Sequence, residues 1–308
     1  MPSIDLKTIL KVCVSVGLLA WVFYRVDVTE LAGVLVSLPA VYLLGAAALI
    51  LLQVPVLAYR WMRILFALQE RQAWGMMCKA TYIGIFFNQA LPGSVGGDFV
   101  RIAELSGSGA SLRVAANSVL LERLSGLYAL VLLMVVISPL VWPRLTDPSI
   151  VIVVLGLAGL LSLAFVLLAF ADRLIPRWRF LTLVKKALAM VRDDYLALLR
   201  HRRITLNILL LGGISWSLNL LAIYLLVIGA GIDIPVLACF FFGGLSILIS
   251  VLPISMAGWG VREGAMVALF GLMGVAPAQA MSVSIAFGVL MLLTALPAGF
   301  LWFRRSPA

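Results

Sequence analysis

The sequence predicts an all-α polytopic integral membrane protein, on the basis of its composition, its long apolar runs and the placement of its basic residues. Of the 308 residues, 64% are hydrophobic and 12% are charged, whereas a typical soluble domain carries about 25% charged residues. Apolar runs of about 17–25 residues recur, which is the length that crosses a hydrocarbon core of about 30 Å as a helix. Lysine and arginine gather between these runs, as expected for the loops of a membrane protein.

Eight apolar segments are predicted to enter the membrane. The first has Lys7 and Lys11 at its start and lacks a small-residue cleavage site, so we expect a retained anchor rather than a signal peptide. In order, the segments are residues 8–24, 41–59, 74–91, 114–140, 149–171, 204–230, 236–252 and 278–303.

The net charge of +10 indicates a membrane surface and not a nucleic-acid partner, because the basic residues flank apolar spans. Cys13, Cys78 and Cys239 lie in apolar runs without paired spacing, so neither a disulfide nor a zinc site is expected. His201 is the only histidine, which excludes histidine-based metal sites and Ser-His-Asp triads. We therefore expect no cofactor.

The distribution of basic residues favours six full spans plus two re-entrant hairpins. If all eight segments crossed fully from a cytoplasmic N-terminus, the nine Lys and Arg of residues 172–203 would lie outside, against the positive-inside rule. Hairpins at residues 74–108 and 236–275, each entering and leaving on one side, place 17 Lys and Arg inside and only Arg25 and Arg144 outside. This topology puts both termini on the cytoplasmic side of the membrane, which we expect to be a bacterial-type inner membrane.

The same topology predicts two repeats of opposite orientation. Residues 1–140 and residues 141–308 each follow the order span, span, hairpin, span. Several secondary transporters are built from such inverted repeats.

Residues 172–203 are predicted to form an amphipathic basic helix. Apolar residues recur there at three- and four-residue spacing among lysines and arginines, a pattern typical of a helix lying on the membrane surface. We expect it on the cytoplasmic leaflet, and a protein-binding face is the alternative.

Two short segments interrupt the apolar pattern in the same way, and their starts are 161 residues apart. Residues 92–101 and 253–262 each run from a proline to an arginine and carry a glycine, Gly97 or Gly258, five residues after the proline. Neither contains the Gly-Lys-Ser/Thr of a nucleotide-binding loop. Matched Gly/Pro-interrupted segments in the two halves of a chain point instead to the substrate site of a transporter.

The two arginines that end these segments suit an anionic oxygen ligand. The guanidinium groups of Arg101 and Arg262 stay charged and can bind phosphate through two parallel hydrogen bonds. Adjacent glycines let backbone amides approach the same oxygens, and a helix starting there adds its positive end. Asp98 and Glu263 are expected to balance the arginines or to bind a cationic headgroup amine. Structural ion pairing within the bundle is the alternative.

A third charged group, Glu122 and Arg123, lies within the predicted span 114–140. An ionisable residue inside a span costs about 2.5–3.5 kcal/mol on insertion scales, so we expect a substrate contact or a structural ion pair. Asn88 lies four residues before Pro92 and is expected to bond the open carbonyl groups of the broken helix.

Three motifs follow one another along the chain. They are Asn-x-x-x-Pro-Gly-x-x-Gly-Gly-Asp-x-x-Arg from Asn88 to Arg101, then Glu122-Arg123-x-x-Gly126, then Gly258-x-Gly260-x-Arg262-Glu263. In this order and spacing the chain resembles the lysylphosphatidylglycerol synthase transmembrane, or flippase-like, family over nearly its whole length. The resemblance implies movement of aminoacylated or other polar lipids between leaflets. Full synthases of the family carry a cytosolic aminoacyl-transferase domain, for which these 308 residues show no counterpart, so synthase activity is not expected.

The leading interpretation is a flippase that moves a phosphate-bearing polar lipid, such as a phospholipid, an aminoacylated phospholipid or a lipid-linked precursor. Its expected partners are membrane phospholipids or polyprenyl-linked lipids, and a separate lipid synthase or glycosyltransferase. The expected substrate-binding residues are Asn88, Gly97, Asp98, Arg101, Glu122, Arg123, Gly258, Gly260, Arg262 and Glu263.

Two other functions fit the same residues. One is an intramembrane lipid-modifying enzyme with Asp98, Glu122 or Glu263 as general base. The other is a non-catalytic membrane partner of a separate lipid synthase, which would dock on residues 172–203.

Overall fold

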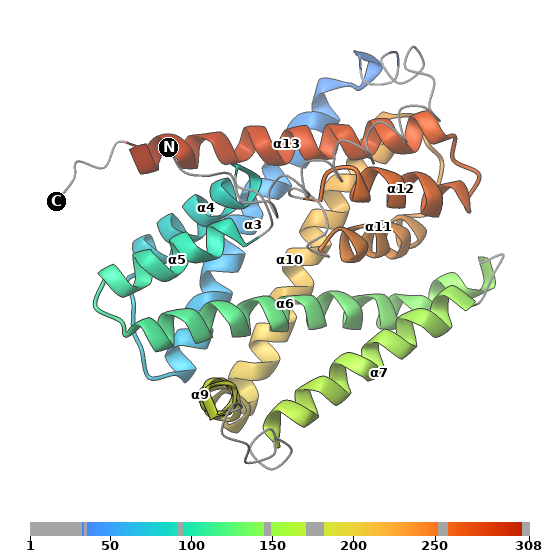
Figure 1. Cartoon of the computed structure of the whole chain (residues 1–308). Helices are drawn as coiled ribbons and strands as arrows, with labels where there is room; N and C mark the ends of the chain where they lie inside the picture. Colours follow the sequence, from blue (N-terminus) through green and yellow to red (C-terminus); the bar gives the residue numbers. More distant parts are fainter. Residues whose placement is uncertain are drawn as a thin grey trace. The chain divides into compact units, whose positions relative to one another are not determined.

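The computed structural model of the chain describes residues 33, 36–90, 95–144, 149–170, 182–251 and 258–303. Within these ranges the regular structure is helical and contains no strand (Figure 1). The elements are α3 (Ala40–Ala67), α4 (Trp74–Ala90), α5 (Gly96–Gly107), α6 (Leu112–Val141), the 3₁₀ turn η1 (Trp142–Arg144), α7 (Ser149–Ala169), α9 (Thr182–Arg200), α10 (Arg202–Gly229), α11 (Val236–Ser250), α12 (Val261–Gly271) and α13 (Pro277–Phe303).

Five of these helices, α3, α6, α7, α10 and α13, are long and apolar enough to cross a membrane. They confirm five of the predicted segments as apolar helices, and the chain is a multi-pass membrane protein. The predicted segment 8–24 lies outside the described residues. Helices α4 and α11, with 17 and 15 residues, are shorter than the ~20 residues of a typical span.

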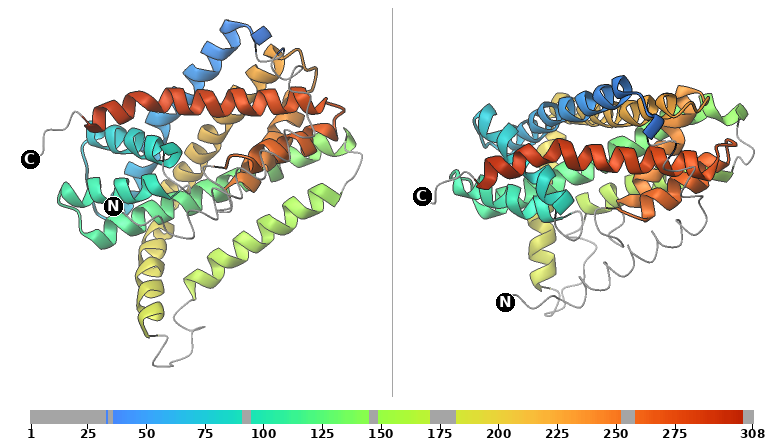
Figure 2. Two further views of the ribbon diagram at one scale, coloured as in Figure 1. Left: turned by 45° about the horizontal axis from the view of Figure 1, so that its top comes forward. Right: turned by 90° about the horizontal axis from the view of Figure 1, so that it is seen from above.

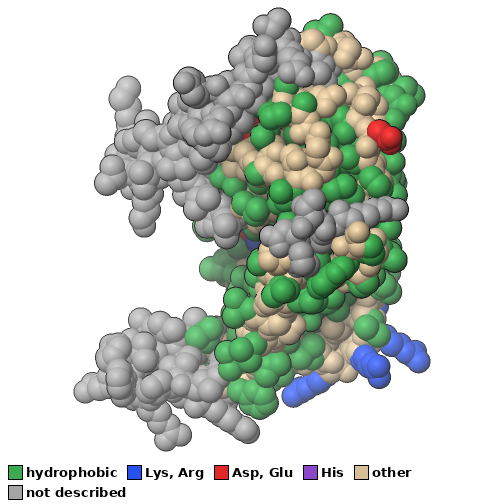
Figure 3. All heavy atoms as spheres, turned by 90° about the vertical axis from the view of Figure 1, so that its right-hand side faces the viewer, with side chains coloured by type: hydrophobic (Ala, Val, Ile, Leu, Met, Phe, Trp, Pro, Cys, Tyr) green, Lys and Arg blue, Asp and Glu red, His purple; other side chains and the backbone are tan. Residues whose placement is uncertain are grey.

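Apolar side chains remain exposed on the helix surfaces, as a lipid environment requires. On the face drawn in Figure 3, hydrophobic side chains cover most of the described surface, and the protruding Lys and Arg side chains lie toward its lower edge. Helix α7 shows this most clearly, since Ile152, Val153 and Leu160 are all exposed.

One predicted boundary is wrong. The apolar segment 41–59 was expected to end before a loop containing Arg60 and Arg63, but α3 continues to Ala67. Arg60 is consequently a helical residue and is only 4% exposed. The residues after Arg60 are again mostly apolar, and Trp61, Ile64 and Leu65 are fully buried, so the helix continues while Arg60 pairs with the buried Glu122.

The described contacts divide the chain into two compact units. Unit 1 contains Met1–Pro55, Cys78–Arg101 and Ser215–Ala308, and unit 2 contains Val56–Met77 and Ile102–Ile214. Parts of α3, α4, α5 and α10 belong to each unit, and each unit is described by itself.

In unit 1, side-chain hydrogen bonds and small residues hold the helices together. The Gln53 amide on α3 donates to the main-chain carbonyl and the hydroxyl of Ser215 on α10, and accepts from Asn219. Close approach of the same two helices is allowed by Gly229, whose backbone packs against Tyr42.

The short helices of unit 1 pack on α13. Helix α12 packs against both α11 and α13 and lies between them in Figure 1. Helix α4 reaches α13 through the Tyr82 hydroxyl, which donates to the Thr294 carbonyl, and through the edge-to-face rings of Phe87 and Trp302. Helix α13 therefore contacts both predicted hairpin regions, since α4 and α12 each pack against it.

In unit 2, α6 packs against α7 and α9. Figure 1 and the left view of Figure 2 show α6 and α7 diverging with distance from η1. A buried apolar cluster that includes Ile64, Leu121, Leu198 and Ile208 joins α3, α6, α9 and α10.

Within the predicted amphipathic segment 172–203, Thr182–Arg200 forms α9 and Arg202 already begins α10, while residues 172–181 lie outside the described residues. Asp194 fastens α9 to α6 by accepting hydrogen bonds from Arg113, at 3.2 Å, and from the Asn117 amide. Burial, and to a lesser degree the neighbouring Tyr128 hydroxyl, raises the pKa of the Tyr195 hydroxyl above its ordinary value, so this hydroxyl stays protonated.

We expect Gln53→Leu to lower the free energy of unfolding by about 0.5–2 kcal/mol, the range for polar contacts between membrane helices. The substitution keeps the volume but leaves Asn219 and Ser215 without their partner. Reversible unfolding in mixed micelles measures the change. Asn207→Leu on α10 is the control, because the Asn207 Oδ1 has no hydrogen-bond partner among the described residues. Equal stability of the two variants would contradict the expectation.

Candidate functional site

Helices α4 and α5 bring two glycines into backbone contact. A Cβ at Gly97 would overlap the carbonyl oxygen of Gly84 and approach the Asn88 side chain to 2.8 Å. A Cβ at Gly84 would meet the aliphatic stem of Arg101 at 2.8 Å. Only glycine allows this approach, so the pair fixes where Arg101 leaves α5. Residues 91–94, with Pro92 and Gly93 of the motif, lie outside the described residues.

Asn88 supports the start of α5. Its Oδ1 accepts a hydrogen bond of 2.9 Å from the Gly97 amide. The first amides of a helix have no partner within it, and the side chain of Asn88 supplies one from the neighbouring helix. A bond to the open carbonyl groups of the broken helix would use the Nδ2 of Asn88, and that expectation stays a prediction.

Asp98 and Arg101 lie one turn apart on α5 and are both buried, at 5% and 7% exposure. An Arg101 Nη1 to Asp98 Oδ1 distance of 3.9 Å makes this a long ion pair. Asp98 also lies in the first turn of α5, where a negative charge is favoured by the helix dipole.

The second broken segment starts α12 with a local cap. Gly258 and Gly260 both have φ of +81°, a conformation that side chains other than glycine rarely adopt. The Gly260 amide donates to Glu263 Oε2 at 2.5 Å. This is the carboxylate half of a capping box, since glycine has no side chain to supply the other half. Residues 252–257, including Pro253, lie outside the described residues.

Arg262 and Glu263 form a closed hydrogen-bonded group with Ser284 of α13. Arg262 Nη2 donates to Glu263 Oε1 at 2.7 Å and Arg262 Nε donates to the Ser284 hydroxyl at 3.2 Å. The Ser284 hydroxyl in turn donates to Glu263 Oε1 at 3.1 Å. The guanidinium also lies 5.1 Å from the Trp259 ring centroid and 5.6 Å from that of Phe287, within cation–π range.

Glu122 belongs to unit 2 and forms a buried ion pair with Arg60 of α3. Arg60 also donates to the Glu122 carbonyl at 3.3 Å. Its guanidinium lies over Gly126 and Gly212, where an added Cβ would come within 2.8 and 3.2 Å of it. Arg123, the next residue on α6, is half-buried.

The structure thus divides the ten expected site residues into three groups. The α4–α5 group and the α12 group belong to unit 1, and Glu122 with Arg123 belongs to unit 2. Sequence reasoning missed Gly84, Ser284 and Arg60. Arg60 could have been found, because a carboxylate within a span requires a cation. A lone serine in an apolar run, such as Ser284, gives no comparable signal.

Among the residues that the structure describes, no group of three or more His, Cys, Asp or Glu side chains is arranged to hold a metal ion. The polar groups available to a ligand are therefore guanidinium, carboxylate, hydroxyl and backbone amide.

These observations define a polytopic helical membrane protein with buried arginine–carboxylate pairs, two of which lie at the glycine-containing starts of α5 and α12. The family model described as the lysylphosphatidylglycerol synthase TM region matches residues 8–299, and the chain belongs to this family. Membership makes it a membrane protein related to phospholipid metabolism. No curated protein matches the chain.

We expect Gly97→Ala to cost about 1–3 kcal/mol, because the added methyl group overfills a packed contact. Gly107→Ala on the same helix is the matched control, since a Cβ there meets nothing within 4 Å. Thermal unfolding in detergent measures both, and the control should be neutral or stabilising. Indistinguishable unfolding temperatures would contradict the close contact of α4 with α5.

We expect Glu122→Gln and Arg60→Met each to destabilise by about 3–5 kcal/mol, because either leaves a buried charge without its partner. The double variant should cost less than the sum of the single variants. A double-mutant cycle on the free energy of unfolding measures this coupling. Asp193→Asn, in the exposed pair with Arg192, should change stability by less than about 1 kcal/mol. Additive effects at positions 60 and 122 would disprove a coupled pair.

Proposed function

We propose that the protein is a flippase that moves a phosphate-bearing polar lipid between leaflets, with Arg101 and Arg262 meeting the headgroup phosphate. The observation that carries this proposal is the common plan of the two helix pairs of unit 1. In each, a helix of 17 or 15 residues is followed, after a few residues outside the described ranges, by a helix of 12 or 11 residues. Each second helix has a carboxylate as its third residue, Asp98 or Glu263, and a buried arginine in its first two turns.

This plan supports the pairing of α4 with α5 and of α11 with α12 as re-entrant hairpins at residues 74–108 and 236–275. The hairpins would belong to inverted repeats at residues 1–140 and 141–308. Both termini would then lie on the cytoplasmic side of an inner membrane. Rocking of such repeats exposes a site to each leaflet in turn. Acyl chains stay in the bilayer, so only the headgroup needs a polar path.

The carboxylates give the empty carrier its own counterions. A lone guanidinium at membrane depth is costly, and Glu263 removes this cost when no lipid is bound. Its two oxygens have separate tasks, because Oε2 caps the Gly260 amide while Oε1 accepts from Arg262. An incoming phosphate can replace Oε1 at the guanidinium while Oε2 continues to hold the start of α12.

The remaining site residues support these groups. Asn88 and Gly97 position α5, Gly258 and Gly260 shape the break before α12, and Glu122 with Arg123 supplies charge in unit 2. The substrates would be phospholipids or polyprenyl-linked lipids made by a separate lipid synthase or glycosyltransferase.

We expect Arg101→Lys and Arg262→Lys each to slow leaflet exchange about tenfold or more, because lysine keeps the charge but loses the bidentate hydrogen bonds to phosphate. Exchange of headgroup-labelled phosphatidylglycerol, aminoacylated phosphatidylglycerol and polyprenyl phosphate in proteoliposomes measures the rate. Arg71→Ala, at an exposed arginine between α3 and α4, should leave the rate unchanged.

Each variant is first compared with the wild type for stability in detergent, so that a misfolded protein is not read as an inactive one. Exchange that neither lysine variant affects would remove Arg101 and Arg262 from the transport path. A folded wild type that exchanges none of the three lipids would contradict the proposed transport.

A further inference from the structure

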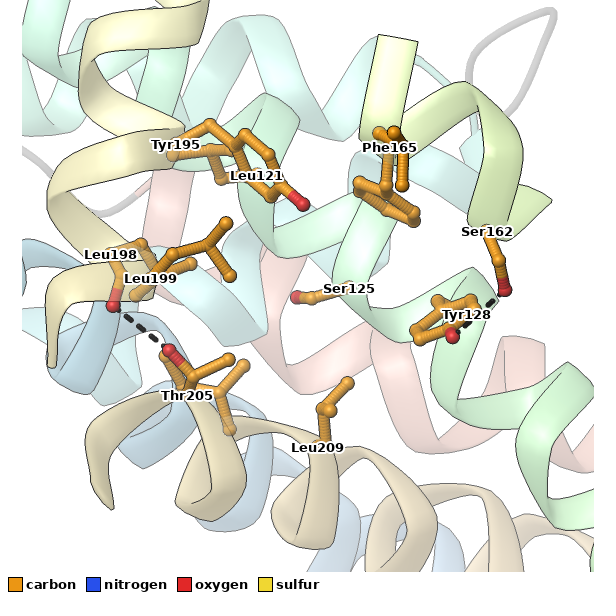
Figure 4. A pocket seen from close by; sticks show the side chains of 12 residues that line it. Leu121, Ser125, Tyr128, Ser162, Phe165, Tyr195, Leu198, Leu199, Thr205 and Leu209 are labelled. Atoms are coloured by element: carbon orange, nitrogen blue, oxygen red, sulfur yellow. Dashed lines mark hydrogen bonds between the residues drawn. The ribbon is translucent and has the colours of Figure 1, made fainter. Parts of the chain in front are cut away.

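Unit 2 contains a second candidate site, a cavity. Its lining includes none of the residues to which the proposed function assigns a role. It has a volume of about 270 Å³ and lies among α6, α7, α9 and α10. Figure 4 shows the side chains of these four helices around one space, with Phe165 of α7 and Tyr195 of α9 on one side and Thr205 and Leu209 of α10 on another. The rings of Phe165 and Tyr195 are stacked with centroids 5.6 Å apart.

The lining offers an apolar surface although it contains several hydroxyl groups. Tyr128 and Ser162 share a hydrogen bond of 3.0 Å across α6 and α7. Ser125 donates to the Glu122 carbonyl and Thr205 to the Leu198 carbonyl. These bonds engage four of the five hydroxyls that line the cavity, the fifth being that of Tyr195, so the cavity suits a hydrocarbon chain better than a polar headgroup.

The size and surroundings also fit a chain. About 270 Å³ holds roughly nine groups the size of a water molecule, which is a stretch of acyl chain. Val166 of α7 lines the cavity and is itself 52% exposed, so the space is reached from the lipid-facing surface of that helix.

A basic turn adjoins the cavity. Leu199 of α9 and Thr205 of α10 line it, and the described residues Arg200, Arg202 and Arg203 between them are exposed. An acyl chain gains little by leaving hydrocarbon for an apolar pocket. The selectivity of the site therefore depends on the charge of the lipid headgroup. Three arginines favour a negatively charged headgroup.

We propose that this cavity is a binding site for an anionic phospholipid, with an acyl chain among α6, α7, α9 and α10 and the phosphate at Arg200, Arg202 and Arg203. The site fastens α9 to the lipid-facing side of α7. It is separate from the proposed transport residues and does not depend on transport activity.

The test uses the full chain in phosphatidylcholine nanodiscs that contain a trace of photoactivatable phosphatidylglycerol, with a diazirine at the end of one acyl chain. After illumination, mass spectrometry should find the label on peptides around Val166 and Leu199. Val166→Trp fills the cavity and should abolish this labelling. Leu163→Trp on the same helix, at a residue equally exposed at 52% that does not line the cavity, should not.

The headgroup is tested with the double variant Arg202→Ala and Arg203→Ala. Labelling by phosphatidylglycerol should fall at least fivefold, whereas Arg71→Ala should leave it unchanged. Phosphatidylcholine carrying the same diazirine should label the site weakly in every variant. Equal labelling by the two lipids, or labelling that persists in Val166→Trp, would overturn the proposal.

Discussion

Hydrocarbon offers no water to a buried charge or to an open helix end, and the polar contacts of this chain follow from that constraint. Glu263 is fully buried, and each of its carboxylate oxygens has a donor, the Gly260 amide for one and Arg262 and Ser284 for the other. Glu122 is matched to Arg60 in the same way. Each of these carboxylates is held together with a cation, which lowers the cost of burying both charges.

The two broken helix pairs meet this constraint by different means. Helix α12 is capped by its own third residue, so its start is stable without help from another helix. Helix α5 depends on Asn88, a side chain of α4, for its Gly97 amide. Separation of α4 from α5 would therefore leave an amide without a partner. A shift of α12 along α13 would leave its cap intact but would break the hydrogen bonds of Arg262 and Glu263 to Ser284.

The helices could be predicted from the sequence because their signal is the length of an apolar run, and residues 114–140 differ from Leu112–Val141 by only a few positions. The end of α3 could not be predicted, because the apolar run is interrupted at Arg60 while the helix continues to Ala67. The glycine breaks and Arg262 were recognised from residue type and spacing. Their hydrogen-bond partners could not be predicted. Local sequence does not show that Asn88 accepts from the Gly97 amide or that Arg262 donates to Ser284.

Helix α13 contacts both helix pairs of unit 1 at separate positions along its length. Ser284 bonds Arg262, and the Thr294 carbonyl accepts from Tyr82, which lies two residues before the glycine that packs against Arg101. Ten residues of helix place these two contacts about 15 Å apart along the axis. This is half of a hydrocarbon core of about 30 Å. Since α13 is long and apolar enough to cross the membrane, an α13 that spans the bilayer would hold the two helix pairs at different depths, and the phosphates proposed for Arg101 and Arg262 would then lie at different levels.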